Sequence, residues 1–239
     1  MSSFFAKAKE IALDILFPPT CLVCRKSLES EEKEIALCRQ CFDEIPVETA
    51  LTCPICRARF AANIKICHRD ASYRLMAASR YENEIVKSLI WRLKYEKLSA
   101  ASKPLSEIAV RHLKLIGFNL ATWRFLPMPL YPARERERGF NQTELIVKDL
   151  NRKTGLPILA GALVRVKDTK AQAELKDFEA RKKNIENCFQ TPHPELLKNQ
   201  NIILADDVFT SGATMEEAVK TLKAGGAGRI IALTIAKAG

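Results

Sequence analysis

The chain has 239 residues, of which 47% are hydrophobic, and it carries a formal net charge of +10 at pH 7 with an isoelectric point near 9.3. This length supports one full α/β core with a small additional unit, so we expect two domains. No apolar run approaches about 18 residues, which excludes a membrane-spanning helix. The positive charge favours polyanionic ligands such as phosphates or nucleic acid, without separating the two.

The first segment of the chain, Phe4–Phe17, is predicted to form an amphipathic helix. Its apolar residues Ile11, Ile15 and Leu16 have helical spacing, and charged residues interrupt the apolar run. The helix is expected to end before Pro18, because proline does not continue a helix. A secretory signal peptide would have a longer uninterrupted apolar stretch. The sequence therefore predicts a cytosolic protein.

Cysteines crowd the next part of the chain, where seven of the eight fall between positions 21 and 67. Six of them form three Cys-x-x-Cys pairs, namely Cys21 and Cys24, Cys38 and Cys41, and Cys53 and Cys56. Two such pairs, separated by about a dozen residues, hold Zn²⁺ tetrahedrally in zinc ribbons. The first two pairs are therefore predicted to form one structural Cys₄ zinc site.

The third cysteine pair has an incomplete partner. It is followed by Cys67, His68 and Asp70, where a second ribbon would have another Cys-x-x-Cys pair. A second metal site would join the third pair and Cys67 to His68 or Asp70, or the site has been lost. Disulfides are disfavoured because the predicted compartment is reducing. A thioredoxin-like redox motif is disfavoured because three clustered pairs are typical of metal sites.

After Ala71 the composition changes, and alternating strand and helix patterns replace the cysteine pairs. We therefore predict two domains, 1–72 and 73–239. In chain order, the predicted elements of the second are a strand at Leu75–Tyr81, helices at Asn83–Tyr95 and Lys103–Ile116, a strand at Phe125–Met128, a helix at Thr143–Lys153, a strand at Ile202–Ala205, a helix at Glu216–Leu222 and a strand at Arg229–Ile235. This order predicts an α/β domain with a parallel sheet flanked by helices.

The most informative segment is Ile202–Thr214, in which a buried strand leads to Asp206 and Asp207 and then to a turn of small hydroxyl residues. The glycine of this turn permits close approach, and the first N–H groups of the following helix form an anion site. Open α/β sheets bind ligands at such a strand end. We expect a phosphate at the turn, with the two carboxylates accepting hydrogen bonds from sugar hydroxyls. The alternative is an ordinary strand-to-helix connection.

A second polar segment, Tyr131–Gln142, is predicted to be a loop in which Arg134, Arg136 and Arg138 alternate with glutamates. It follows a strand of the same predicted sheet, so its arginines are expected to reach the same crevice. The forked donors of arginine suit a diphosphate. The alternative is a charged face exposed to solvent.

The segment Ile202–Thr214 resembles the phosphoribosyl-diphosphate (PRPP) loop of type I phosphoribosyltransferases, whose pattern is an apolar run, two acids and then Val-x-Thr-Ser/Thr-Gly-x-Ser/Thr. The resemblance implies the type I phosphoribosyltransferase fold, with a flexible hood over the site. It implies Asp206 and Asp207 as catalytic residues that hold the ribose hydroxyls. The residues implied around the 5′-phosphate are Thr210, Ser211, Gly212, Ala213 and Thr214.

Further motifs resemble the ComF family of competence-associated proteins, which joins a cysteine-rich unit to a phosphoribosyltransferase domain. These motifs are Leu16–Cys24, Leu93–Tyr95, Gly139–Gln142, Leu163–Thr169, Gln172–Leu175 and Arg181–Asn184. The resemblance implies that Lys167–Glu186 is the hood, with Lys170, Gln172 and Arg181 as PRPP contacts. The alternative is a solvated connector before Ile202. The chain departs from the family at Asp70, where many members keep a cysteine, and at Glu174, where glycine is usual.

Three functions follow from the resemblance. The first is a Mg²⁺-dependent transfer of ribosyl 5-phosphate from PRPP to an acceptor that the sequence does not identify. The second is handling of incoming single-stranded DNA during natural transformation, with PRPP as a ligand and with competence helicases or DNA-processing proteins as partners. In this function the zinc ribbon and the basic surface hold the strand, and the candidate stacking rings are those of Phe42, Phe60, Tyr73 and Trp91. The third is nucleotide salvage without a DNA role.

Overall fold

A computed structural model describes residues 18–60, 68, 71–169 and 183–238. Several predictions concern other residues: the helix Phe4–Phe17, the metal ligands Cys67 and Asp70, and the hood contacts Lys170, Gln172 and Arg181 lie outside the described residues. Within the described ranges, none of the helices combines the length and apolar character that crossing a bilayer requires.

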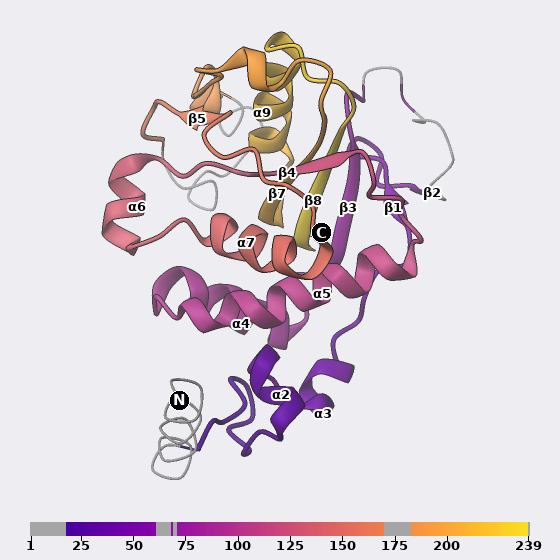
Figure 1. The fold of residues 1–239 in the computed structure, drawn as a ribbon, viewed down its shortest axis with the longest axis vertical. Helices are drawn as coiled ribbons and strands as arrows, with labels where there is room; N and C mark the ends of the chain where they lie inside the picture. Colours follow the sequence, from indigo (N-terminus) through magenta and orange to yellow (C-terminus); the bar gives the residue numbers. More distant parts are fainter. Residues whose placement is uncertain (1–17, 61–67, 69–70, 170–182, 239) are drawn as a thin grey trace, which may run out of the picture.

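The core of the molecule is a six-stranded sheet with the strand order β2-β1-β3-β8-β7-β4 (Figure 1). Its centre consists of four parallel strands, namely β3 (Arg74–Arg80), β8 (Ile230–Lys237), β7 (Asn201–Phe209) and β4 (Trp123–Pro127). Two short antiparallel strands extend one edge, β1 (Leu51–Thr52) and β2 (Arg59–Phe60). The central strands are buried on both faces, which explains their nearly continuous apolar runs. The predicted parallel α/β sheet is confirmed.

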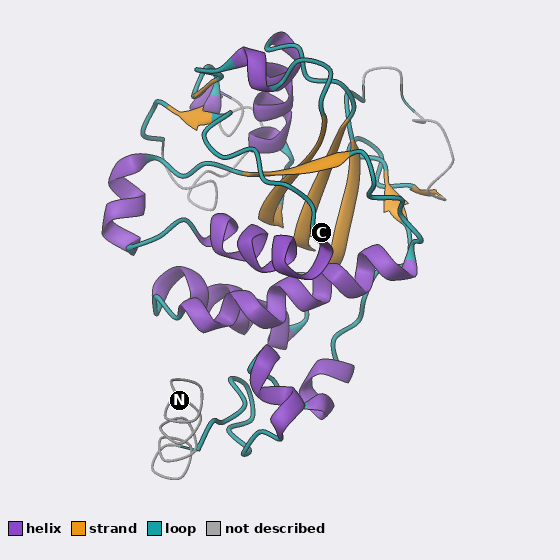
Figure 2. Ribbon diagram, in the orientation of Figure 1, coloured by secondary structure: helices purple, strands orange, loops and turns teal. Residues whose placement is uncertain are grey.

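Helices cover both faces of this sheet (Figure 2). The longer ones are α4 (Glu84–Tyr95), α5 (Ser102–Leu115), α7 (Gln142–Thr154) and α9 (Ala213–Ala224). The first three share one buried core, which includes Leu89 and Leu105 with Phe125 of β4. Helix α9 shares a second core with the other face, where Val219 packs with Leu204 of β7. The bounds of each helix lie within a few residues of the prediction, and each helix turns apolar residues toward the core.

Shorter elements complete the described chain. They are the helices α2 (Ser30–Ile35), α3 (Arg39–Asp43) and α6 (Pro132–Arg138), the 3₁₀ turns η1 (Ser99–Ala101) and η3 (Pro194–Leu196), and the strand pair β5 (Val164–Arg165) and β6 (Phe189–Gln190). Strand β1 follows the second cysteine pair, and its Thr52 pairs with Leu75 of β3. The hydrogen-bonded sheet thus runs across the boundary predicted between residues 72 and 73, and that division stays a prediction.

Two predictions about secondary structure are wrong. The segment expected to be a polar loop contains α6, because Pro132 begins the helix, Arg and Glu are good helix formers, and Gly139 ends it with φ 88°. Strand β7 does not end at Ala205 but continues to Phe209. The extension arises because β7 stays paired with β8 beyond that point, with Asp206 opposite Thr234.

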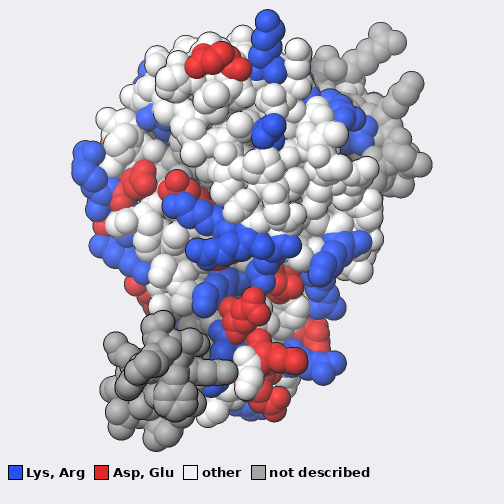
Figure 3. Space-filling view, viewed as in Figure 1, with Lys and Arg blue, Asp and Glu red and all other residues white. Residues whose placement is uncertain are grey.

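The surface carries its basic residues unevenly. In Figure 3, Lys and Arg side chains gather in a band across the middle of the face shown, over α5 and α7, while acidic side chains gather below it. Among the contributing helices, α7 carries Lys148 and Arg152, whose side chains are 52% and 72% exposed. Part of the positive charge of the chain thus lies in a basic stripe on this face (Figure 3).

A buried carboxylate joins the cysteine-rich segment to the sheet. The side chain of Glu48 is 6% exposed and forms ion pairs with Arg59, Arg80 and Lys237. Its backbone N–H donates to the carbonyl oxygen of Ala78, 2.9 Å away, and its own carbonyl oxygen contacts buried His112. Burial opposes the charge of Glu48, but hydrogen bonds from the two arginines outweigh it and hold its pKa below the ordinary value. Glu48 therefore links strands β2, β3 and β8 through its ion pairs.

We expect Glu48→Gln to lower the free energy of unfolding at pH 7 by about 2 kcal/mol, because charge-assisted hydrogen bonds are lost. Since the folded pKa is depressed, the stabilisation is present at neutral pH and is lost as pH falls through the folded pKa. Urea unfolding at pH 7 and in acid measures both effects. Glu34→Gln, at an exposed position, is the control and should change stability by less than about 0.5 kcal/mol. Equal stability of wild type and Glu48→Gln at pH 7 would contradict the assignment.

Candidate functional site

A cavity of about 320 Å³ lies where β7 and β4 end. The turn between β7 and α9 lines it, together with α4, α6, the start of α7 and strand β5. The predicted residues Asp206, Asp207, Thr210, Gly212 and Thr214 all line this cavity. Ser211 instead lines a neighbouring cavity of about 310 Å³ on the side of the third cysteine pair. The carboxyl end of the sheet thus holds the site, as the topology predicts.

The turn before α9 requires a glycine. Gly212 has φ 85°, and a Cβ atom at this position would lie 2.7 Å from Cζ of Phe209. A side chain at this position would be strained by the positive φ and would force the Phe209 ring to move. The chain therefore passes close over the Phe209 ring and enters α9 at Ala213, so that the first N–H groups of the helix are presented near the cavity.

The acidic pair lies on β7 itself and has its own counterion. Asp207 is 4% exposed, and its carboxylate accepts hydrogen bonds from Lys94 Nζ at 2.7 Å and from Gln142 Nε2 at 3.0 Å. The carboxylate of Asp206 accepts the backbone N–H of Asp207 at 2.8 Å. Burial, followed by the charge of Asp207, raises the pKa of Asp206 to about 7. The charge of Asp207 is thus balanced by Lys94, whereas Asp206 gains or loses its proton near neutral pH.

Lys94 and Gln142 are functional residues that the sequence prediction missed. Burial disfavours the charge of Lys94, but the carboxylate of Asp207 outweighs it and raises the lysine pKa. Both residues belong to motifs that carried the family resemblance, and that was the only signal available to find them. Their contact with β7 depends on the tertiary fold.

Two of the three predicted arginines reach the cavity. Arg134 and Arg138 line it, whereas Arg136 is exposed and does not. The reason is that the segment is helical: residues four apart share a face of α6, and the residue midway between them points elsewhere. Arg134 contacts Asp168 at 3.4 Å and the carbonyl oxygen of Thr169. The two arginines of this segment therefore reach the cavity from one helix face and not from a loop.

Arg165 on β5 is a third arginine of the cavity, and the sequence prediction missed it. It lines the cavity, donates to Thr169 Oγ1 and lies over the ring of Phe189, 5.6 Å from its centroid. Its Nε is buried and has no hydrogen-bond partner within the described ranges. Burial lowers the pKa of Arg165, and the nearby charge of Arg134 lowers it further. Neighbouring guanidinium groups in this position favour a polyanion between them.

A side chain next to the third cysteine pair reaches the phosphate turn. Arg57 Nη2 donates to the carbonyl oxygen of Thr210 at 3.0 Å, and its guanidinium carbon lies 4.4 Å from the centroid of the Phe209 ring. This arrangement combines a hydrogen bond with a cation–π contact. The cysteine-rich segment is thus in direct contact with the turn that requires Gly212.

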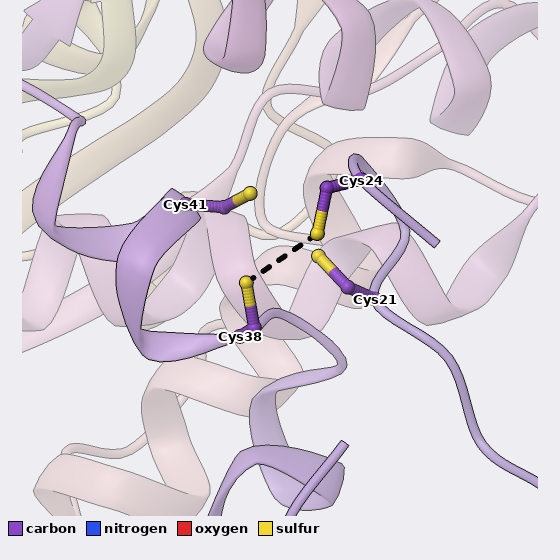
Figure 4. Close-up of side chains that lie close together, drawn as sticks. All are labelled: Cys21, Cys24, Cys38 and Cys41. Atoms are coloured by element: carbon purple, nitrogen blue, oxygen red, sulfur yellow. Dashed lines mark hydrogen bonds between the residues drawn. The ribbon is translucent and has the colours of Figure 1, made fainter. Parts of the chain in front are cut away.

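The first two cysteine pairs form one cluster (Figure 4). The sulfur atoms of Cys21, Cys24, Cys38 and Cys41 all lie within 4.8 Å of one another, and the sulfurs of Cys24 and Cys38 are 3.6 Å apart. Four thiolates at about 2.3 Å from a tetrahedral Zn²⁺ would lie about 3.8 Å apart. The donor set and its spacing fit the predicted structural zinc site.

The third pair gathers a different set. Cys53, Cys56 and His68 place their ligand atoms within 4.8 Å of one another, and Cys53 Sγ lies 3.5 Å from His68 Nδ1. Two sulfurs and one imidazole nitrogen are suitable zinc ligands. Since Cys67 and Asp70 lie outside the described residues, the fourth ligand of this second site stays a prediction.

Replacing Cys38 and Cys41 by serine should reduce bound zinc by about one ion per chain, because a Cys₄ site loses half of its ligands. Metal analysis of the purified protein measures zinc content, and proteolysis within residues 18–45 should become faster. The control is Cys188→Ala, which removes a buried cysteine outside both clusters. Zinc content equal to that of wild type in the double variant would contradict the site.

Two family models match the chain. Residues 12–70 match the double zinc ribbon domain, and residues 147–239 match the phosphoribosyl transferase domain. The first match covers both cysteine clusters, and the second covers β7, the phosphate turn and α9. The sequence signals and the spatial arrangement therefore agree with the same two families.

Several curated proteins are similar over most of the chain. Competence protein F of Haemophilus influenzae is 28% identical over 214 residues, covering 85% of this chain and 90% of that protein. The DNA utilization protein YhgH of Escherichia coli K12 is 27% identical over 222 residues, covering 89% and 94%. Competence protein ComFC of Bacillus subtilis is 28% identical over 209 residues, covering 82% and 80%. Over most of its length the chain is thus similar to competence protein F, YhgH and ComFC, and its two parts match the double zinc ribbon and phosphoribosyl transferase family models.

Proposed function

We propose that the chain binds PRPP in the cavity between β7, α4 and α6. The observation that carries this proposal is that one cavity is lined by two carboxylates, a glycine turn and three guanidinium groups. PRPP has a ribose with two free hydroxyls, a 5′-phosphate and a diphosphate. It therefore matches the chemistry of these lining groups.

Each part of the site has a role in this proposal. The turn Thr210–Thr214 and the start of α9 hold the 5′-phosphate through N–H and hydroxyl donors. Asp206 and Asp207 accept hydrogen bonds from the ribose hydroxyls. Arg134, Arg138 and Arg165 bind the diphosphate, and Mg²⁺, when bound with PRPP, would supply further positive charge there.

Lys94 and Gln142 position Asp207 for this task. Both donate to its carboxylate, so the side chain is fixed before a ligand arrives. A fixed acceptor loses little freedom when it binds a sugar hydroxyl. Asp206 accepts ribose hydrogen bonds best when it is ionised, which favours binding above its pKa of about 7.

The same arrangement suits phosphoribosyl transfer. In that reaction an acceptor atom forms a bond to ribose C1, the bond from C1 to the diphosphate oxygen breaks, and the electron pair leaves with the diphosphate. The arginine side of the cavity would stabilise the charge that develops on the leaving group. Transfer in nucleotide salvage, without a DNA role, is the alternative to a competence function.

We infer from the names of the relatives that PRPP binding serves the uptake or use of DNA by the cell. Their printed names are competence protein F, DNA utilization protein YhgH and competence protein ComFC. The basic stripe over α5 and α7 provides a surface for phosphate backbones (Figure 3). Single-stranded DNA in the cytosol is the proposed polyanion, with competence helicases or other DNA-processing proteins as partners.

Calorimetry at pH 8 with PRPP and Mg²⁺ tests the ligand. We expect Asp206→Asn with Asp207→Asn to weaken binding about 100-fold, because hydrogen bonds from ribose to two charged acceptors are lost. Asp206→Asn alone keeps the Lys94–Asp207 ion pair and should lower the affinity for PRPP about tenfold. Because the ion pair is kept, weaker binding by this variant reflects a lost ligand contact and not a folding defect. Asp43→Asn on α3, outside the cavity, is the control and should bind like wild type. Equal affinity of wild type and the double variant would contradict the site.

Fluorescence anisotropy of a labelled single strand tests the DNA role. We expect a steep loss of affinity with salt, at about 0.7 logarithmic units per phosphate contact, and a smaller slope after zinc is removed by a chelator. Reloading zinc should restore the slope, which controls for damage to the protein. An unchanged slope in the zinc-free protein would show that the ribbons do not contribute to DNA binding.

A further inference from the structure

Two aromatic side chains on α4 are exposed beside the cavity. Trp91 is 51% exposed and Tyr95 is 64% exposed, and their ring centroids are 5.9 Å apart with a 43° angle between the ring planes. Among the side chains that the structure describes, they are the only aromatic rings in the group of large, mainly exposed hydrophobic residues. Exposing two large rings on one helix face needs a physical reason.

The rings are not needed for packing. The apolar stripe of α4 that enters the core consists of other residues, Val86, Leu89, Ile90 and Leu93. Trp91 and Tyr95 are four residues apart and so share a different face of the helix. That face lines the same cavity as Asp206 and Thr210. Lys94, between the two rings in sequence, forms the ion pair with Asp207.

The other candidate stacking rings are less suitable. Tyr73 is 4% exposed and therefore packs in the core. Phe42 is partly buried against the core, and the guanidinium of Arg111 lies 5.5 Å from the centroid of its ring. The side chain of Phe60 lies outside the described set. Of the four predicted rings, Trp91 is the one that the structure leaves available, and Tyr95 was missed because it lies at the end of an ordinary amphipathic helix.

The chemistry around the two rings indicates what they bind. Flat aromatic faces stack on bases at a gain that depends little on sequence. The same cavity contains the cations Lys94, Arg134 and Arg138, which suit phosphates and not an apolar peptide. A ligand with a flat ring beside a sugar and phosphates satisfies both features.

We propose that Trp91 and Tyr95 form the stacking surface for an unpaired nucleobase next to the phosphoribosyl site. This inference rests on the proposed function, since it places a base where an acceptor or the next nucleotide of a strand would meet a bound phosphoribosyl group. The base is either free or part of a single strand. Both sources share the chemistry that the rings recognise.

Tryptophan fluorescence reports this contact directly. The chain has two tryptophans, and Trp123 is 6% exposed with its ring packed against Phe118. In a Trp123→Phe variant, the emission comes from Trp91 alone. We expect nucleobases, nucleosides or a short thymidine strand to quench it, because a stacked base contacts the indole. The ligand that quenches at the lower concentration identifies the source.

An abasic strand of the same length separates stacking from charge. It carries the same phosphates, so it should bind more weakly than the thymidine strand and should not quench Trp91. Equal quenching by both strands, or no quenching by any base or strand, would overturn the proposal. Calorimetry with PRPP on the same variant keeps the two claims apart: PRPP binding without quenching refutes the stacking surface alone, and quenching without PRPP binding refutes the phosphoribosyl site alone.

Substitutions on α4 test the role of the rings in affinity. With a labelled thymidine strand, Trp91→Ala should weaken binding about tenfold, and Trp91→Phe should keep affinity within about threefold of wild type. Leu196→Ala on η3 removes a side chain that is 45% exposed and does not line the cavity, and it should bind like wild type. Equal affinities for Trp91→Ala and Leu196→Ala would overturn the assignment, and the rescue by phenylalanine distinguishes stacking from a folding defect.

Discussion

The close approach of Gly212 to the ring of Phe209 is the constraint on which the site depends. A side chain at Gly212 would be strained by the positive φ of the backbone and would force the Phe209 ring to move. The same ring receives the guanidinium of Arg57, which also holds the carbonyl oxygen of Thr210. Strand β7, the phosphate turn and the cysteine-rich segment therefore meet at one aromatic ring. The Phe209 ring thus determines the shape of the turn and also contacts the cysteine-rich segment.

The cavity is lined by charged side chains of both signs. On the acidic side, Lys94 neutralises Asp207, while burial and its neighbour leave Asp206 with a pKa near 7. On the basic side, Arg134 and Arg165 lie close enough for the charge of one to lower the pKa of the other. The cavity thus combines carboxylates that can accept hydrogen bonds from hydroxyl groups with cations that attract negative charge, and the proposal of PRPP as the ligand rests on this combination.

The fold was largely predictable because its signals are local. Apolar runs and helical stripes identified the central strands and the four longer helices, and paired cysteines identified the first metal cluster. The site was less predictable. The arginine segment was expected to be a loop, and only its helical geometry shows why Arg136 faces away from the cavity. Lys94 and Gln142 lie 113 and 65 residues from Asp207 in sequence, and no local pattern reports such contacts.

A structure of the full chain crystallised with PRPP and Mg²⁺ tests the central claim most directly. The account predicts the 5′-phosphate within hydrogen-bond distance of the backbone N–H groups of the turn Thr210–Thr214. It also predicts the ribose hydroxyls on Asp206 and Asp207, and the diphosphate facing Arg134, Arg138 and Arg165. PRPP bound elsewhere, or bound with its diphosphate on the turn and its ribose away from the acidic pair, would contradict the account.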